Sequence, residues 1–250
     1  MRAGPGSRPR ALGYSSPMLT LRKHKITRLE EFSDAVFGFA LTLLVITANV
    51  PRSYPELIML LQGIPSFACC FALLVWIWSE HDRFFERYGV QDGRTTLINS
   101  ALLFVVLLYI YPLKFMFDSF MMQFGLVASP DLKRMTLEEL ARASAIYGFG
   151  FFVLMSLFAL LYHNAWRQRD VLELDRIDAF DTRSHAGHHL VSAGVGLFAM
   201  AFALLGPRRL AFLSPASFGL MGPAHALYGR ARQRQRDRLA ADRAATVHNS

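Results

Sequence analysis

The chain has 250 residues, of which 53% are hydrophobic and 18% are charged, and its formal net charge is +8. This composition is too apolar for an ordinary soluble domain. Two adjacent cysteines, Cys69 and Cys70, provide no framework for a disulfide-stabilised scaffold. The apolar residues occur in blocks rather than in amphipathic stripes, which predicts an all-α protein with membrane-spanning helices.

The chain begins with residues 1–27, a basic segment whose glycines, prolines and serines predict a disordered cytoplasmic tail. The first predicted span covers about residues 31–50 and ends before Pro51. The second covers about residues 56–79, and Pro65 within it predicts a kink.

The third predicted span covers about residues 95–117, and a longer polar connection of residues 118–144 follows it. Within this connection we expect an amphipathic piece around Leu132–Ala143. Thr136 and Glu139 have the spacing of a capping box, in which each side chain bonds the backbone N–H of the other residue.

The last predicted spans cover about residues 145–163, 187–206 and 209–229. The final one is the weakest, because two prolines and two glycines interrupt it: Pro215, Gly219, Gly222 and Pro223. We therefore predict a polytopic membrane protein in which residues 28–229 form one unit of six transmembrane helices. Five spans plus a re-entrant or surface segment is the alternative. Residues 230–250 form an Arg-rich cytoplasmic tail.

The distribution of basic residues predicts the orientation of these spans. With the N-terminus in the cytoplasm, 20 of the 27 lysines and arginines fall on the inner side and 6 on the outer side, and Lys114 lies within a span. Cytoplasmic loops carry an excess of lysine and arginine. We therefore expect a multi-pass protein of the cell membrane with both termini cytoplasmic, and we expect no nucleic-acid partner.

Charged and polar residues stand at the start of the first span, where Arg28, Ser33 and Asp34 precede a long apolar run. Ionisable groups in a membrane helix are expensive unless they are paired or line a polar path, so they point to function. Further along the same helix, Phe39, Thr42 and Ile46 share one face, at spacings of three and four residues. From the residues alone, a tightly packed helix interface is the simpler interpretation of that face.

Two residues of later spans are predicted partners for the charged start. His81 ends the second span and Asn99 begins the third, and both fall at the depth of Asp34 in this topology. We expect them to form a hydrogen-bonded cluster that holds the first helix in place.

These residues resemble the signature of the transmembrane-protein-175 family of potassium-permeable channels. The resemblance consists of Arg28-x-x-x-Phe32-Ser33-Asp34 in the first helix and of a second helix ending with Trp78, His81 and Phe84. A third helix entered through Asn99 completes it. The specific match covers about residues 28–112.

The resemblance implies six-helix units whose first helices line a central pore, so a chain with one unit would form a homotetramer. It places the narrowest apolar ring at Phe39, with Thr42 and Ile46 above it. It assigns a supporting network to Arg28, Phe32, Ser33, Asp34, His81 and Asn99. Family members usually have Ile or Leu where this chain has Phe39. Four phenyl rings would narrow or dewet the pore, or would offer their faces to a cation.

We therefore predict a channel that conducts potassium passively and needs no cofactor or resident metal. One alternative is a proton-coupled secondary transporter that titrates Asp34 and His81. The other is a non-conducting membrane scaffold sealed by Phe39. The chain has no Gly-rich phosphate loop, zinc-protease motif or nucleophile elbow, so we do not expect an enzyme.

Overall fold

The structure is a computed structural model and describes residues 26–47, 50–123, 125, 135–207, 210 and 213–248. Most of these residues lie in helices. In chain order the α-helices are α1 (Arg28–Ile46), α2 (Tyr54–Gln62), α3 (Ile64–Tyr88), α4 (Gly93–Gln123), α5 (Leu137–Arg167), α6 (Arg176–Leu205) and α7 (Met221–His248). A 3₁₀ helix, η2 (Pro215–Leu220), precedes α7.

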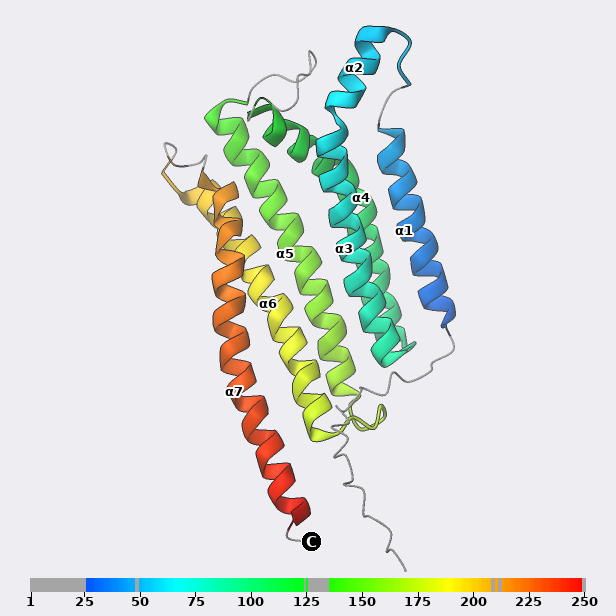
Figure 1. Cartoon of the computed structure of the whole chain (residues 1–250), viewed down its shortest axis with the longest axis vertical. Coiled ribbons are helices and arrows are strands. Elements are labelled where there is room, and N and C mark those ends of the chain that lie inside the picture. Colours follow the sequence, from blue (N-terminus) through cyan, green and yellow to red (C-terminus); the bar gives the residue numbers. More distant parts are fainter. Residues whose placement is uncertain are drawn as a thin grey trace, which may run out of the picture.

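The long helices run alternately up and down a single bundle (Figure 1). Helix α1 lies at one edge, where it packs on α3 and α4. Helix α5 packs against α4 and α6, and α7 packs on the far side of α6. The first residue of α1 and the last turns of α7 lie at the same end of the bundle in Figure 1.

An aromatic cluster joins α3 to α5 and α6 near that end of the bundle. The rings of Phe84 and Tyr162 meet edge to face, with their centroids 5.1 Å apart. The Tyr88 hydroxyl donates a 2.9 Å hydrogen bond to Thr182 Oγ1. Edge-to-face pairs add to the energy of burial, so this cluster fixes α3 relative to the rest of the bundle.

Helices α5 and α6 approach each other through glycine. A Cβ atom added to Gly148 would lie 2.8 Å from the Gly196 carbonyl oxygen, and one added to Gly196 would lie 3.0 Å from the Gly148 carbonyl oxygen. Small residues allow membrane helices to pack backbone against backbone. This contact makes α5 and α6 the closest long pair of the bundle.

Four of the described helices, α3 to α6, are long and apolar enough to cross a membrane. Helix α1 is not among them, because four charged residues lie in its first seven: Arg28, Glu30, Glu31 and Asp34. Helix α7 is not among them either, since arginines recur along it from Arg230 onwards. The protein is thus an all-α membrane protein with four candidate spans in its described part.

The predicted second span differs from the observed helices. The chain breaks at Gly63 into α2 and α3, and Pro65 lies in the first turn of α3. A proline there removes only an N–H that has no intrahelical partner, so Pro65 begins a helix instead of kinking one. Helix α3 runs on to Tyr88 and ends at Gly89, whose φ of 55° suits the left-handed C-terminal cap.

The capping box at Thr136 and Glu139 is confirmed, because Thr136 Oγ1 accepts from the Glu139 N–H and Glu139 Oε2 accepts from the Thr136 N–H. The separate amphipathic piece expected at 132–143 is wrong in its described part. The capping box opens α5, which continues without a break to Arg167. Residues 132–134 lie outside the described residues.

The predicted sixth span, 209–229, is not one helix. Pro215 stands in the first turn of η2, and α7 begins at Met221 and continues to His248. Residues 209, 211 and 212 lie outside the described part of the chain, as do residues 1–25 of the predicted N-terminal tail.

Candidate functional site

Helix α1 starts with its own capping box. The Glu30 N–H donates to Thr27 Oγ1 over 3.1 Å, and the Thr27 N–H donates to Glu30 Oε2 over 3.2 Å. Glu31 adds a second negative charge to the first turn, where the helix dipole favours acidic groups. These residues fix where the helix begins, and so they fix which side chains face the bundle.

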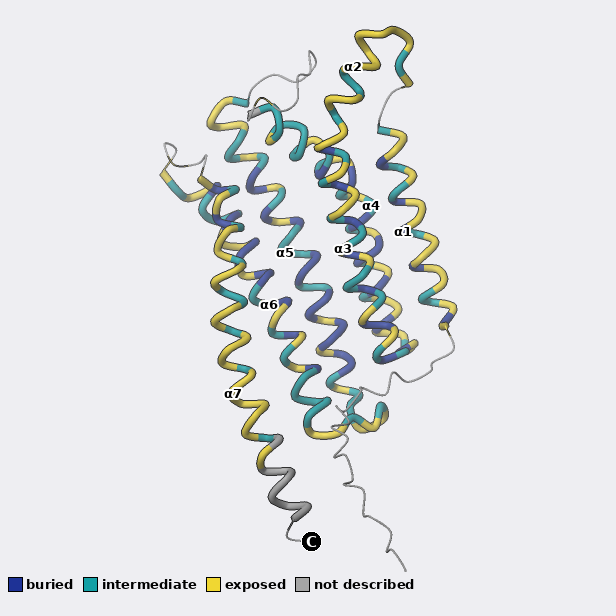
Figure 2. The backbone as a smooth tube through the Cα atoms, in the orientation of Figure 1, coloured by how far each residue is buried: buried dark blue, intermediate teal, exposed yellow. Residues whose placement is uncertain are grey.

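Helix α1 has two faces with the same spacing, and exposed and buried turns alternate along it in Figure 2. The buried face consists of residues at intervals of four, three and four: Ser33, Phe37, Ala40 and Leu44. A second row repeats the same intervals and is exposed throughout: Arg28, Phe32, Ala35, Phe39, Thr42 and Ile46. We call this second row the exposed seam of α1. It contains all three residues that the sequence placed on the pore.

The structure brings Ser33, His81 and Asn99 together from α1, α3 and α4. His81 Nε2 lies 2.8 Å from Asn99 Oδ1, and the Asn99 amide donates to Ser33 Oγ over 2.9 Å. The Ser33 hydroxyl in turn donates to the Leu29 carbonyl over 2.7 Å. All three side chains are buried. Buried polar groups need hydrogen-bond partners, so these bonds tie α1 directly to α4 and, through Asn99, to α3.

The direction of these hydrogen bonds follows from the fixed donors and acceptors. Asn99 Oδ1 can only accept, so we assign the His81 proton to Nε2. His81 Nδ1 is buried and has no hydrogen-bond partner among the described residues. The ring is enclosed by Phe37, whose centroid is 5.3 Å away, and by Phe85 at 4.6 Å. The site thus holds a neutral imidazole between apolar rings.

Asp34 lies outside this chain of hydrogen bonds. Its Oδ1 accepts a 2.8 Å hydrogen bond from the indole N–H of Trp78. Phe32 and Arg28 belong to the exposed seam, and Arg28 makes no hydrogen bond or ion pair with another described residue. Three of the six predicted network residues, Ser33, His81 and Asn99, are thus joined by hydrogen bonds. A fourth, Asp34, is bonded to α3 through Trp78.

Sequence reasoning left Phe37 and Trp78 out of the site. Both had a detectable signal. Phe37 lies four residues after Ser33, on the same helical face. The Trp78 indole N–H is a donor that can reach an acceptor such as Asp34 on a neighbouring helix.

A second polar cluster holds the start of α4 against the end of α5. Asp92, directly before α4, accepts hydrogen bonds from Thr95, from the Asn164 amide at 3.1 Å and from the Gln168 amide at 3.0 Å. The Arg94 N–H also donates to it. Burial alone would raise the pKa of Asp92, but these hydrogen bonds to the carboxylate outweigh it and lower the pKa below its ordinary value of 3.8.

The histidines of α6 occupy different surroundings. His189 is buried and stacks on Phe158 and Tyr162, at centroid distances of 5.1 and 5.3 Å. The neighbouring His188 instead pairs with His225 of α7 at 3.9 Å. Within the described ranges, no three histidine, cysteine or carboxylate side chains gather as metal ligands would.

Comparison with known proteins gives consistent matches to one family. A sequence model of the family described as "Endosomal/lysosomal potassium channel TMEM175" matches residues 28–109, the part of the chain that holds α1 and its three-residue network. A potassium channel of Marivirga tractuosa is 34% identical over 238 residues, which cover 91% of this chain and 96% of that protein. A potassium channel of Chamaesiphon minutus is 27% identical over 192 residues, covering 71% and 82%.

Two solved structures have the same fold. A crystal structure of a variant of the potassium channel MtTMEM175, bound to a nanobody–MBP fusion protein, superposes with a TM-score of 0.78 and 34% identity, covering 88% of this chain and 98% of that chain. A lysosomal potassium-selective channel TMEM175 homologue from Chamaesiphon minutus superposes with a TM-score of 0.52 and 20% identity, over 80% and 96% of the two chains. At this lower identity the second match supports the fold alone. With one relative 34% identical over nearly its whole length, this chain belongs to the TMEM175 family of potassium channels.

Proposed function

We propose that this chain forms a potassium-permeable channel, in which the α1 helices of four copies surround an axial pore. The observation that carries this proposal is the exposed seam of α1, whose residues recur at alternating intervals of four and three residues along the length of the helix. A row of this period is the pattern by which helices associate around a common axis. No helix of the described part of the chain covers its residues.

The composition of the seam suits such a central position. Ala35 lies in the seam and Gly38 beside it, and both are exposed and small enough to let neighbouring copies approach closely. The position of α1 at the edge of the bundle leaves this face open (Figure 1). Packing four bundles by this edge would bring four seams together without disturbing α3 to α7.

The pore that results is lined by apolar groups. The phenyl ring of Phe39 is 57% exposed, and Ile46 follows it two turns later. Between them, the Thr42 hydroxyl donates to the Phe39 carbonyl of its own helix over 2.7 Å, so it presents its methyl group to the seam. An apolar constriction controls conduction by its radius and hydration. We assign the narrowest ring to Phe39, with Thr42 and Ile46 above it.

The network of Ser33, His81 and Asn99 has a positioning role in this proposal. Its hydrogen bonds fix the rotation of α1 about its own axis, because Ser33 must face α4. That rotation places Phe39 on the opposite side of the helix. Asp34 and Trp78 restrain the same turn from α3.

The full topology in this proposal is six spans with both termini in the cytoplasm. Helix α1 measures about 28 Å at 1.5 Å per residue, close to the ~30 Å of a hydrocarbon core. Helix α7 returns along the whole of α6 (Figure 1). Arginines gather at the end of the bundle where α1 begins and α7 ends, among them Arg87, Arg94, Arg167 and Arg183, as the positive-inside rule requires of the cytoplasmic side.

The test is potassium flux into proteoliposomes that contain the purified protein, with sodium flux measured in parallel. We expect the wild type to pass potassium faster than sodium, driven by voltage and without a proton gradient. Phe39→Ala should change the rate or the preference. Phe104→Ala, which removes an equally exposed ring from α4, should change neither.

Three outcomes of the flux measurement, and one of the subunit count, would contradict parts of the proposal. Absence of flux from the wild type and from Phe39→Ala would exclude a channel. Flux only from Phe39→Ala would identify a scaffold whose pore is sealed by the four rings. Flux that requires a proton gradient would identify a coupled transporter. Native mass spectrometry gives the subunit number, and any value other than four would exclude the homotetramer.

A further inference from the structure

A large cavity lies within the bundle, away from α1. Its volume is about 830 Å³, and it is lined by residues of α3, α4, α5 and η2 and by Met135, which precedes α5. Pockets that bind small molecules have volumes of about 300–1,000 Å³ and are mostly apolar. No charged residue lines this cavity in the part of the chain that the structure describes. A void of this size would forfeit many packing contacts if it stayed empty.

The cavity is elongated along the helices. On α4 its lining extends from Val105 to Met122, and on α5 from Leu140 to Leu154. At 1.5 Å per residue, the α4 stretch corresponds to about 25 Å, most of the thickness of a bilayer's hydrocarbon core. Both helices are candidate membrane spans, so a molecule that enters the cavity comes from the hydrocarbon core of the bilayer.

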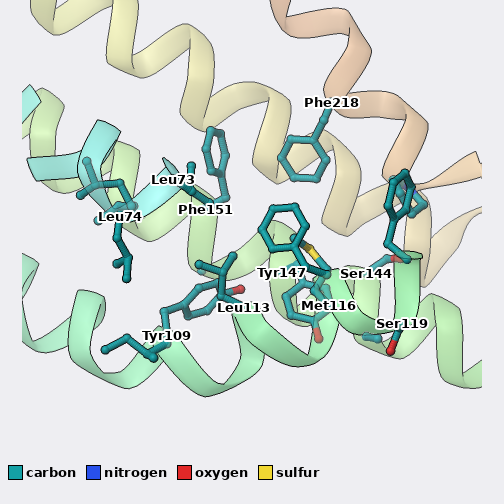
Figure 3. Close-up of a pocket in the computed structure, with 18 of the residues that line it drawn as sticks. Leu73, Leu74, Tyr109, Leu113, Met116, Ser119, Ser144, Tyr147, Phe151 and Phe218 are labelled. Carbon is teal, nitrogen blue, oxygen red and sulfur yellow. The ribbon is translucent and has the colours of Figure 1, made fainter. Parts of the chain in front are cut away.

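The two ends of the cavity differ in polarity. Figure 3 shows Leu73 and Leu74 at one end and Ser119 and Ser144 at the other. Ser119 and Ser144 lie towards the end of the bundle that carries α2, whereas the apolar lining reaches the middle of α3 and α5. The Ser119 hydroxyl is buried and has no hydrogen-bond partner among the described residues. A buried hydroxyl that has no partner among the described residues can donate to an acceptor carried by a ligand.

The lining can also adapt to a flexible occupant. Met116, Met122 and Met135 contribute side chains to it, and methionine fills irregular apolar spaces because its chain is unbranched and polarizable. Phe151 and Phe218 meet edge to face at 5.3 Å and close one side against η2 (Figure 3).

We propose that this cavity is a lipid-binding site that holds one acyl chain of a membrane phospholipid. The chain lies along α4 and α5 with its tail towards Leu73 and Leu74, and the ester end lies beside Ser119 and Ser144. The polar end of the cavity then lies at the end of the bundle that carries α2, where the headgroups of one leaflet lie. The apolar end then lies deeper in the hydrocarbon core. The length, the apolar lining and the unpaired hydroxyl all fit this ligand.

The experiment uses the full chain in phosphatidylcholine liposomes that contain a small fraction of phosphatidylcholine with a diazirine on its acyl chain. After irradiation, mass spectrometry maps the labelled residues. We expect the cavity residues of α4 and α5 to carry several-fold more label than Phe104 and Phe149, which are exposed on the outer faces of the same helices. Equal labelling of the cavity and the outer faces would overturn the proposal. That result would mean that residues 124–134 or a second copy cover the cavity.

Two matched variants sharpen the test. Ala143→Trp fills the cavity from α5 and should reduce the cavity label several-fold. Ile146→Trp places the same ring on the exposed face of the same helix and should leave the label unchanged. If Ala143→Trp fails to give a monodisperse helical protein, Ala216→Phe fills the cavity from η2 instead. Cavity labelling that persists in a folded filling variant would overturn the site. Labelling does not depend on conduction, so this result is separate from the flux test.

Discussion

The two faces of α1 have the same spacing and opposite surroundings. Phe37 and Phe39 are two residues apart, yet Phe37 is 3% exposed and Phe39 is 57% exposed. The buried face carries a serine that donates to its own helix and also accepts a hydrogen bond from Asn99 on another helix. The exposed seam carries a threonine whose partner lies on its own helix. Long-range hydrogen bonds therefore select the face that packs within the chain, and the seam is left for other copies and for the pore.

The largest expected effect on stability comes from replacing Phe37 and Phe39 with alanine, one at a time. Phe37→Ala should lower the free energy of unfolding by about 3 kcal/mol, because it leaves a cavity beside His81. Phe39→Ala should change the stability of the single chain by less than about 0.5 kcal/mol. Unfolding in mixed detergent micelles, followed by circular dichroism, measures both. Equal losses of unfolding free energy from the two variants would mean that Phe37 and Phe39 do not differ in how they pack within the chain.

The second effect concerns the network behind the buried face. Asn99→Ala should lower the free energy of unfolding by about 2 kcal/mol, because His81 and Ser33 both lose a partner in a buried site. Ser100→Ala is the matched control. Its hydroxyl bonds only the Thr96 carbonyl of its own helix, so we expect a change of at most a few tenths of a kcal/mol. An equally small loss from Asn99→Ala would show that the network does not hold α1.

A smaller effect is expected where α1 meets α3 near its exposed side. Trp78→Phe keeps an aromatic ring but removes the donor to Asp34, and should lower the free energy of unfolding by about 1 kcal/mol. Asp34→Asn keeps an acceptor at the same place and should lower it less. The opposite order would mean that the charge of Asp34, and not its hydrogen bond, holds the helix.

The smallest effect concerns Asp92, whose hydrogen bonds join the start of α4 to the end of α5. Helix α4 is one of the two helices that the buried face of α1 packs on. The pKa of Asp92 is lowered in the folded state, so its contribution is fully present above the ordinary value of 3.8 and disappears as the pH falls through the lower folded value. At pH 7, Asp92→Asn should lower the free energy of unfolding by about 0.5 kcal/mol, given its partial exposure. Near pH 3 the difference should shrink. A constant difference across this range would show that the charge of Asp92 makes no contribution.

Local features of the fold were predictable from the sequence. The capping box of α5 follows from Thr136 and Glu139 alone, because its hydrogen bonds join residues three apart. The common face of Phe39, Thr42 and Ile46 follows from the helical period, and all three residues are exposed in the structure. Family membership was also within reach, because the signature from Arg28 to Asn99 lies within the matched residues 28–109.

Other features were not predictable because they depend on several distant residues at once. Pro65 gave a reason for a kink, but whether the helix bends or breaks depended on Gly63 and on the packing of α3. The segment before the fourth span was predicted to be a separate amphipathic piece, because its polar residues lower the hydropathy. In the structure, α5 continues through these residues without a break. The partner of Asp34 was expected among His81 and Asn99, and the structure supplies Trp78.

The sequence by itself determined that this protein enters the membrane, that a capping box forms at Thr136 and Glu139, and that Phe39, Thr42 and Ile46 share one face of a helix. These are consequences of composition, of capping and of the 3.6-residue period, all of which act over a few neighbouring residues. Only the tertiary structure decided which row of α1 is buried, and which donor reaches Asp34. It alone decided that residues of α3, α4, α5 and η2 line one cavity. Such outcomes depend on the shapes of helices that meet across long sequence separations, where close packing leaves one arrangement of lowest energy.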